Sequence, residues 1–83
     1  MEITRDIEKL IESDYDQIEN FEVTYKNGGK VCGIAKSITF NPLNLTIKKN
    51  KTKRFEKSTH QVVFDHVTKI TLFYLDKSQR SLS

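Results

Sequence analysis

The sequence predicts a mainly β domain in which one N-terminal α-helix precedes five short antiparallel strands, strongly bent into a small open barrel. Three observations predict this fold. Apolar residues recur with a helical period over residues 3–18 and with a period of two from Phe21 onward. The turn Asn27-Gly28-Gly29 then joins two apolar runs, which is typical of a β-hairpin. Gly33 lies inside the second run, where a glycine often marks the sharp bend with which a small barrel closes.

Residues 3–18 carry the apolar stripe of the predicted helix. Its members recur at steps of three, four and one, and they are Ile3, Ile7, Leu10, Ile11, Tyr15 and Ile18. Thr4 is a candidate N-cap, and the helix dipole favours the acids Asp6 and Glu8 in the first turn. Serine and aspartate are mediocre helix formers, so we expect the helix to fray or end near Ser13–Asp16. Its other face is almost wholly acidic.

The five strands are expected at residues 21–25, about 30–39, from Leu45 onward, 61–65 and 68–75. Phe40-Asn41-Pro42 predicts a turn before the third strand, because proline lacks a backbone donor. The polar residues 48–58 predict strand ends around a long exposed hairpin loop. Residues 1–75 therefore form one domain, with the helix at about 3–18 and the barrel at about 20–75. Residues 76–83 are expected to be a polar, disordered C-terminal tail.

The length and the cysteine content leave few ways to stabilise this domain. A chain of 83 residues buries only about 60% of its unfolded surface. Cys32 is the only cysteine, which excludes an intrachain disulfide, and with His60 and His66 it makes no structural zinc site. Assembly into an oligomer is the remaining source of stability. No apolar run is long enough to cross a membrane and no signal-peptide pattern is present, so we expect a cytoplasmic protein without a membrane partner.

The net charge of +3 divides into two opposite parts. Residues 1–22 hold eight acids and two bases, a net charge of −6, whereas residues 23–83 hold twelve bases and three acids, a net charge of +9. This asymmetry favours a body that meets a polyanion and a helix that faces elsewhere. The alternative is that both charged surfaces only keep a small protein soluble.

The run from Gly28 to Ile47 resembles the first motif of the Sm and LSm family. Gly28 and Gly33 keep the spacing of that motif's hairpin glycine and bend glycine. Asn44-Leu45 is similar to its loop asparagine and the apolar residue that follows. The chain departs from the motif at Thr39, where the family usually has aspartate, and in a loop that is one residue longer.

The run from Gln61 to Val67 resembles the second motif as it occurs in Hfq-type bacterial Sm proteins. Asp65 departs from it, because the family has lysine or arginine there. The layout of one helix before five strands is also that of the family. A second relative is the Rho-binding antiterminator family, to whose Asp-Tyr-Asp motif Asp14-Tyr15-Asp16 is similar.

The resemblance implies an Sm-like (SH3-type) barrel that assembles as a homo-oligomeric ring of five to seven subunits and binds single-stranded RNA. A neighbour's fifth strand would pair with the fourth strand, and two loops of each subunit would line a central pore. The pore residues implied are Phe40, Asn41, Asn44 and His66. Asparagine and histidine can bond base edges, and aromatic rings can stack on unpaired bases. Structural roles stay open for three of them: Asn44 as a turn residue, His66 as a strand-end residue and Phe40 as part of the core.

The basic run after the third strand is a second candidate site for RNA. Its cations are Lys48, Lys49, Lys51, Lys53, Arg54 and Lys57. They would neutralise phosphates and give an affinity that depends on salt rather than on base sequence. Phe55 among them could stack on a base. The alternative is a solvated hairpin tip.

The sequence offers no catalytic residues, cofactor site or metal site, and we expect no enzyme. Serines have no activating base at a recognisable spacing, and no phosphate-binding glycine motif is present. Cys32 is expected to be a core or interface thiol. The alternative function is a transcription or antitermination regulator that presents the acidic helix face to a protein partner and is not primarily an RNA binder. A purely structural oligomer is a third class.

Overall fold

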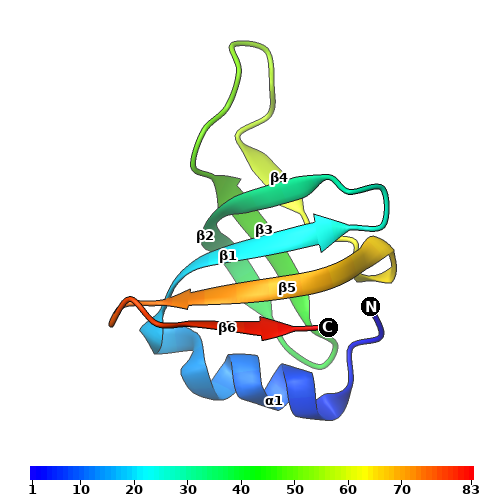
Figure 1. Cartoon of the computed structure of the whole chain (residues 1–83), viewed down its shortest axis with the longest axis vertical. Coiled ribbons are helices and arrows are strands. Elements are labelled where there is room, and N and C mark those ends of the chain that lie inside the picture. Colours follow the sequence, from blue (N-terminus) through cyan, green and yellow to red (C-terminus); the bar gives the residue numbers. More distant parts are fainter.

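The computed structural model describes residues 1–83 and is mainly β, as predicted: an N-terminal helix precedes a six-stranded antiparallel sheet that is not closed (Figure 1). The sheet has the strand order β4-β3-β2-β1-β5-β6. In chain order the elements are α1 (Arg5–Asp14), a 3₁₀ turn (Tyr15–Gln17), β1 (Ile18–Tyr25), β2 (Lys30–Thr39), β3 (Asn44–Lys49), β4 (Thr59–Gln61), a second 3₁₀ turn (Phe64–His66), β5 (Val67–Tyr74) and β6 (Gln79–Leu82).

α1 begins at its predicted cap and ends in the predicted region. The Thr4 hydroxyl accepts a hydrogen bond of 3.2 Å from the backbone N–H of Ile7. The helix stops at Asp14, and the 3₁₀ turn leads directly into β1. Ile18, which the helical period assigns to the helix, is instead the first residue of β1. At ten residues α1 is too short and too polar to cross a membrane.

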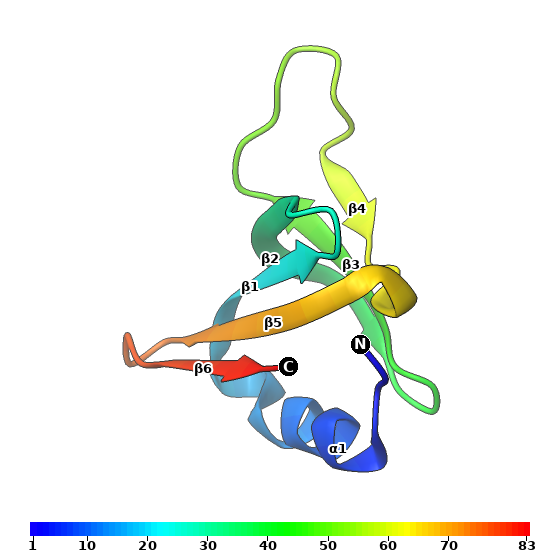
Figure 2. The same cartoon turned by 45° about the vertical axis from the view of Figure 1, so that its right-hand side comes forward.

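The core lies between α1 and the concave face of the sheet (Figure 2). It is formed mainly by alternate residues of the strands, as a period of two requires, together with one helix residue and the loop residues Leu43 and Val62. Its buried side chains are Ile11, Phe21, Val23, Leu43, Leu45, Ile47, Val62, Val67, Ile70 and Leu72. The ten residues come from α1, β1, β3, β5 and the segments beside β3 and β4, whereas β2 adds only half-buried side chains such as Val31, Ala35 and Ile38.

Gly33 lies where β2 passes from its pairing with β1 to its pairing with β3. Its partner on β1 is Phe21, and its partner on β3 is Lys49. A Cβ atom at Gly33 would stand 1.9 Å from the backbone oxygen of Lys48, so only glycine permits this approach of β2 to β3. The β-bulge falls slightly later, between Ala35 and Ser37.

The prediction of five strands is wrong, because the polar tail contributes a sixth. β6 pairs with β5 through partners that include Ile70 with Leu82 and Leu72 with Arg80. A tight turn makes this possible: Asp76 Oδ1 accepts from Ser78 N at 2.9 Å, and Lys77 adopts a φ of 73°. Leu82 packs against the core and gives the strand its only apolar anchor.

The prediction of a strand at residues 61–65 is wrong, because β4 is shorter, lies earlier and shares only Gln61 with it. β4 pairs with β3 from Thr59 to Gln61, and Val62 N still donates to Leu45 O at 2.9 Å. The chain then turns through Phe64–His66 into β5. Ahead of β4, the loop of residues 50–58 projects from the end of the molecule opposite to α1, as Figures 1 and 2 both show. The long exposed loop is therefore where the sequence places it.

Candidate nucleic-acid interface

The basic hairpin, residues 48–58, is the most exposed part of the chain. It comprises the end of β3 and the projecting loop, and every residue from Asn50 to Ser58 is exposed. The loop carries four exposed cations that form no ion pair: Lys51, Lys53, Arg54 and Lys57. Lys48 is also exposed, whereas Lys49 is half-buried and bound to Glu56. The sequence-predicted basic site thus lies on one continuous projection.

Glu56 closes the tip of the basic hairpin into a turn. Its carboxylate accepts from Lys49 Nζ at 2.8 Å and from Lys53 N at 3.1 Å. The Glu56 N–H donates back to Lys53 O at 3.0 Å. The hydrogen bond from Lys49, and then that from Lys53, hold the pKa of the Glu56 carboxyl below its usual value. The single acid of the hairpin is therefore used to shape the tip.

This closed turn presents Phe55 to solvent. The side chain is 94% exposed, and the Arg54 guanidinium carbon lies 5.4 Å from the centroid of its ring. That distance suits a cation–π contact, which fixes the ring beside a positive charge. A large apolar ring with no place in the core leaves its surface available for stacking.

The predicted pore residues of the β2–β3 loop lie beside α1. Phe40 is half-buried against the core, so its structural role is the one the geometry favours. Asn41 has a φ of 62°, and its backbone N–H donates to Glu8 Oε2 at 2.8 Å. Asn41 shares a hollow with Arg5, Glu8, Lys9 and Glu12. Asn44 is exposed at the start of β3, where it pairs with Thr39. Glu8 occupies the Asn41 N–H, and the two acids of the hollow balance its two cations, so the loop offers a phosphate no excess of positive charge.

His66, the fourth predicted pore residue, lies at another place in the fold. It is exposed at the end of the second 3₁₀ turn, and its backbone oxygen accepts from Lys26 N at 2.8 Å. It lines a cavity of about 390 Å³ together with Tyr25, Lys26, Asn27, His60 and Val63. The geometry thus groups His66 with the β1–β2 turn, and Asn41 with α1.

Sequence reasoning missed the pairing of Tyr25 with His60. The Tyr25 hydroxyl lies 2.5 Å from His60 Nε2, and the two rings meet edge to face with centroids 5.5 Å apart. Partial burial, with the positive charge of Lys49 nearby, holds the pKa of His60 below its ordinary value. The two residues are 35 positions apart, so no local pattern could have joined them.

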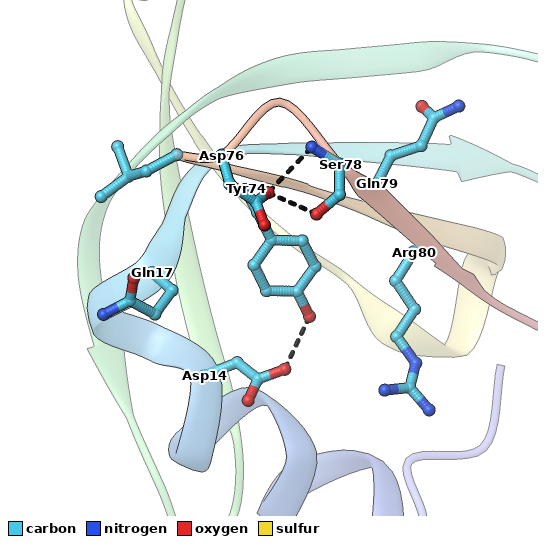
Figure 3. A pocket seen from close by; sticks show the side chains of 8 residues that line it. Asp14, Gln17, Tyr74, Asp76, Ser78, Gln79 and Arg80 are labelled. Carbon is cyan, nitrogen blue, oxygen red and sulfur yellow. Dashed lines mark hydrogen bonds between the residues drawn. The ribbon is translucent and has the colours of Figure 1, made fainter.

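A second cavity, of about 460 Å³, lies between the end of α1 and the β5–β6 turn (Figure 3). The Tyr74 hydroxyl donates to Asp14 Oδ2 at 2.7 Å across it. Burial, followed by this hydrogen bond, raises the pKa of Tyr74 to about 12. Arg80 lies on the opposite wall in Figure 3. This hydrogen bond holds β5 against the end of α1, so both side chains have a structural role.

The remaining reactive side chain is the half-buried Cys32. Its sulfur accepts from Asn50 Nδ2 at 3.6 Å. Burial, together with the negative charge of Glu22, raises the pKa of the thiol, so it stays protonated and unreactive at neutral pH. No three histidine, cysteine, aspartate or glutamate side chains are grouped as a metal site would require.

The chain matches no protein-family model, no curated protein and no solved structure at a significant level. The basic hairpin combines four cations that form no ion pair with a phenyl ring that is 94% exposed.

Proposed function

We propose that this chain is an Sm-like protein that binds single-stranded RNA, and that the basic hairpin is its principal contact. One observation carries the proposal: Phe55 is 94% exposed at the tip of a projecting loop whose other side chains include four unpaired cations. Unpaired bases stack on exposed aromatic rings, while lysine and arginine neutralise the adjoining phosphates. A duplex offers no free base faces to such a ring, so single strands are preferred.

The order of the elements supports the Sm-like part of the proposal. After the helix, the strands β5-β1-β2-β3-β4 are adjacent in the sheet, and β2 requires a glycine at its closest approach to β3. A long β2 shared between two pairings is what a strongly bent small barrel needs. The added β6 extends the sheet beyond β5 without changing this order.

The distribution of charge supports the choice of the hairpin over the β2–β3 loop. α1 and its carboxylates lie at the end of the molecule opposite to the hairpin (Figure 1). A polyanion is attracted to the hairpin end and repelled from the helix end. The binding is expected to be tolerant of base sequence, since stacking and phosphate contacts read no base edges.

Assembly into a ring is the second part of the proposal, and β6 alters how it can occur. The outer edge of β5 is occupied by β6, so a neighbour's β4 finds no free β5 to pair with. The two free edges of the sheet are β4 and β6. Head-to-tail pairing of these edges would close a ring, and each subunit would add one hairpin to the binding surface. Light scattering tests this part: the mass of a monomer would contradict it.

A matched pair of variants tests the RNA contact. Phe55→Ala is expected to weaken binding to a fluorescein-labelled oligo-U by about fivefold or more, because stacking contributes about 1–3 kcal/mol per base. Phe55→Trp, which keeps an aromatic ring, is expected to bind like the wild type. The wild-type chain failing to bind oligo-U or oligo-A in low salt would contradict the proposal, as would equal affinities of all three proteins.

A second candidate function is recognition of a basic protein partner by α1. The observation that favours it is that the two ion pairs of the structure, Lys49–Glu56 and Lys77–Glu19, use none of the helix carboxylates. Unpaired acids on one helix suit a cationic surface. Binding of a lysine-rich peptide that is lost in Glu12→Gln, with oligo-U binding unchanged, would support this candidate. A peptide that binds both proteins equally would exclude it.

A further inference from the structure

The cavity that contains His66 is built from two parts of the chain. Tyr25, Lys26 and Asn27 come from the end of β1 and the turn after it, and His60, Val63 and His66 come from β4 and the segment that follows. We call this cavity the His60 pocket. Its volume of about 390 Å³ lies within the range of small-molecule sites, about 300–1,000 Å³. Lys26 N donates to His66 O, which ties the two parts together.

The bond to Tyr25 uses Nε2 of His60 and leaves Nδ1 as the free ring nitrogen. The Tyr25 hydroxyl oxygen accepts a long bond of 3.4 Å from Val63 N, and we assign its own hydrogen to the bond with His60 Nε2. A neutral imidazole that accepts at Nε2 carries its hydrogen on Nδ1. That Nδ1–H has no partner in the chain and is not buried, so it can donate to a ligand.

The other polar groups of the His60 pocket are donors as well. Asn27 Oδ1 is occupied by Gly29 N at 2.9 Å, which leaves the amide NH₂ free. Lys26 is exposed and forms no ion pair. No carboxylate lines the pocket. The pocket therefore offers hydrogen-bond donors and one positive charge, and it has no carboxylate to repel an anion. Such a site selects a negatively charged ligand that is rich in hydrogen-bond acceptors.

An apolar surface accompanies these donors. Val63 is 48% exposed, and the Tyr25 ring stands beside it with its hydroxyl already bonded. A ring or a sugar can pack there while its oxygen atoms face the donors. A nucleotide combines these features: a phosphate, a ribose and a base whose carbonyl oxygens accept hydrogen bonds.

The His60 pocket also lies next to the basic hairpin along the chain. His60 follows Lys57 by three residues, so at most about 11 Å separates their Cα atoms. An RNA strand that contacts Lys57 can therefore place a neighbouring nucleotide in the pocket. We propose that the His60 pocket binds one nucleotide of the RNA held by the hairpin, with its phosphate near Lys26 and its base against Val63. This inference rests on the proposed function.

The first experiment tests the pocket with small ligands in place of an RNA strand. The ring signals of His60 and His66 are followed by nuclear magnetic resonance during titrations with uridine 5′-monophosphate, uridine and inorganic phosphate. We expect the monophosphate to shift both histidines and to bind more tightly than either uridine or phosphate. Signals that do not move would overturn the inference. Equal responses to the monophosphate and to inorganic phosphate would also overturn it, because only an anion site would remain.

The second experiment measures oligo-U affinity for two matched variants that each remove one exposed lysine. Lys26→Gln is expected to weaken binding by at least about tenfold, because a charge-assisted hydrogen bond is lost. Lys36 lies on β2, outside the pocket and the hairpin. The Lys36→Gln variant is therefore expected to bind oligo-U like the wild type. Equal affinities of the two variants would overturn the inference and leave the hairpin proposal standing. If the wild-type chain fails to bind oligo-U while the monophosphate still shifts the histidines, the proposed function fails and the pocket is a mononucleotide site that holds no RNA.

Discussion

Removing charge from the basic hairpin should reduce the salt dependence of RNA binding by a calculable amount. Lys51 and Lys53 are exposed and form no ion pair, so both are free to meet phosphates. On single strands each neutralised phosphate contributes about −0.7 to the slope of log affinity against log salt concentration. The double variant Lys51→Gln/Lys53→Gln should therefore lose about 1.4 from the slope. Between about 50 and 200 mM salt, wild-type affinity then falls about sevenfold more than that of the variant.

Fluorescence anisotropy of labelled oligo-U across this salt range measures both slopes. The matched control is Lys36→Gln/Lys69→Gln, which removes the same charge from β2 and β5. Its slope should equal that of the wild type, because neither residue lies on the hairpin. A hairpin variant with the wild-type slope would refute the reasoning, since the phosphates would then be bound elsewhere. Equal losses in both double variants would refute it too, because they would indicate a response to net charge alone.

Three further predictions concern the fold. Gly33→Ala should lower the free energy of unfolding in urea by more than about 3 kcal/mol, because the added methyl meets a backbone oxygen of β3. Gly28→Ala, at a φ of +86° with open space, should cost only about 1 kcal/mol, and equal losses would contradict the close approach. The lowered pKa of His60 means that the folded state favours the neutral imidazole. The free energy of unfolding should therefore be highest above about pH 6.5 and fall as the pH drops toward the pKa of the folded state. His60→Gln should reduce that decline, and an unchanged pH profile would contradict this assignment. Deleting residues 79–83 frees the edge of β5 and should change the number of subunits per particle, measured by light scattering. An unchanged number of subunits would contradict the role given to the sheet edges.

The elements that could be predicted are those with a local signal. The apolar stripe and Thr4 locate α1, and Asn27-Gly28-Gly29 locates the turn between β1 and β2. Gly33 was identified from its position inside a strand, and the close approach of β3 explains why no side chain fits there. The constraints on α1 and on the β1–β2 turn come from residues adjacent in the chain, and such constraints leave a readable pattern. At Gly33 the constraint comes from β3, and only the glycine itself marks it in the sequence.

The elements that were missed depend on contacts between distant residues. β6 has one apolar anchor, Leu82, and its turn uses Asp76 and Lys77 instead of glycine or asparagine. Neither feature distinguishes a strand from a polar tail in the sequence. β4 ends early because the chain must turn at once into β5. Pairing with a strand that is already placed, rather than local preference, sets these boundaries.

The candidate site divides in the same way. The basic hairpin could be predicted because its cations and Phe55 are consecutive in the chain. The pore residues were assigned through resemblance, and the backbone hydrogen bond from Asn41 to Glu8 places their loop beside an acidic helix. The bond between Tyr25 and His60 depends on how the sheet is ordered, and no spacing in the sequence encodes it.

The most direct test of RNA binding by the basic hairpin is a photochemical crosslink. Oligo-U containing thiouridine is bound to the wild-type chain, irradiated and digested, and the crosslinked peptides are identified by mass spectrometry. We expect crosslinks within residues 50–58, with Phe55 as the principal site, and their loss when the salt concentration is raised. Crosslinks confined to the Phe40–Asn44 loop or to α1, or none at all, would contradict it.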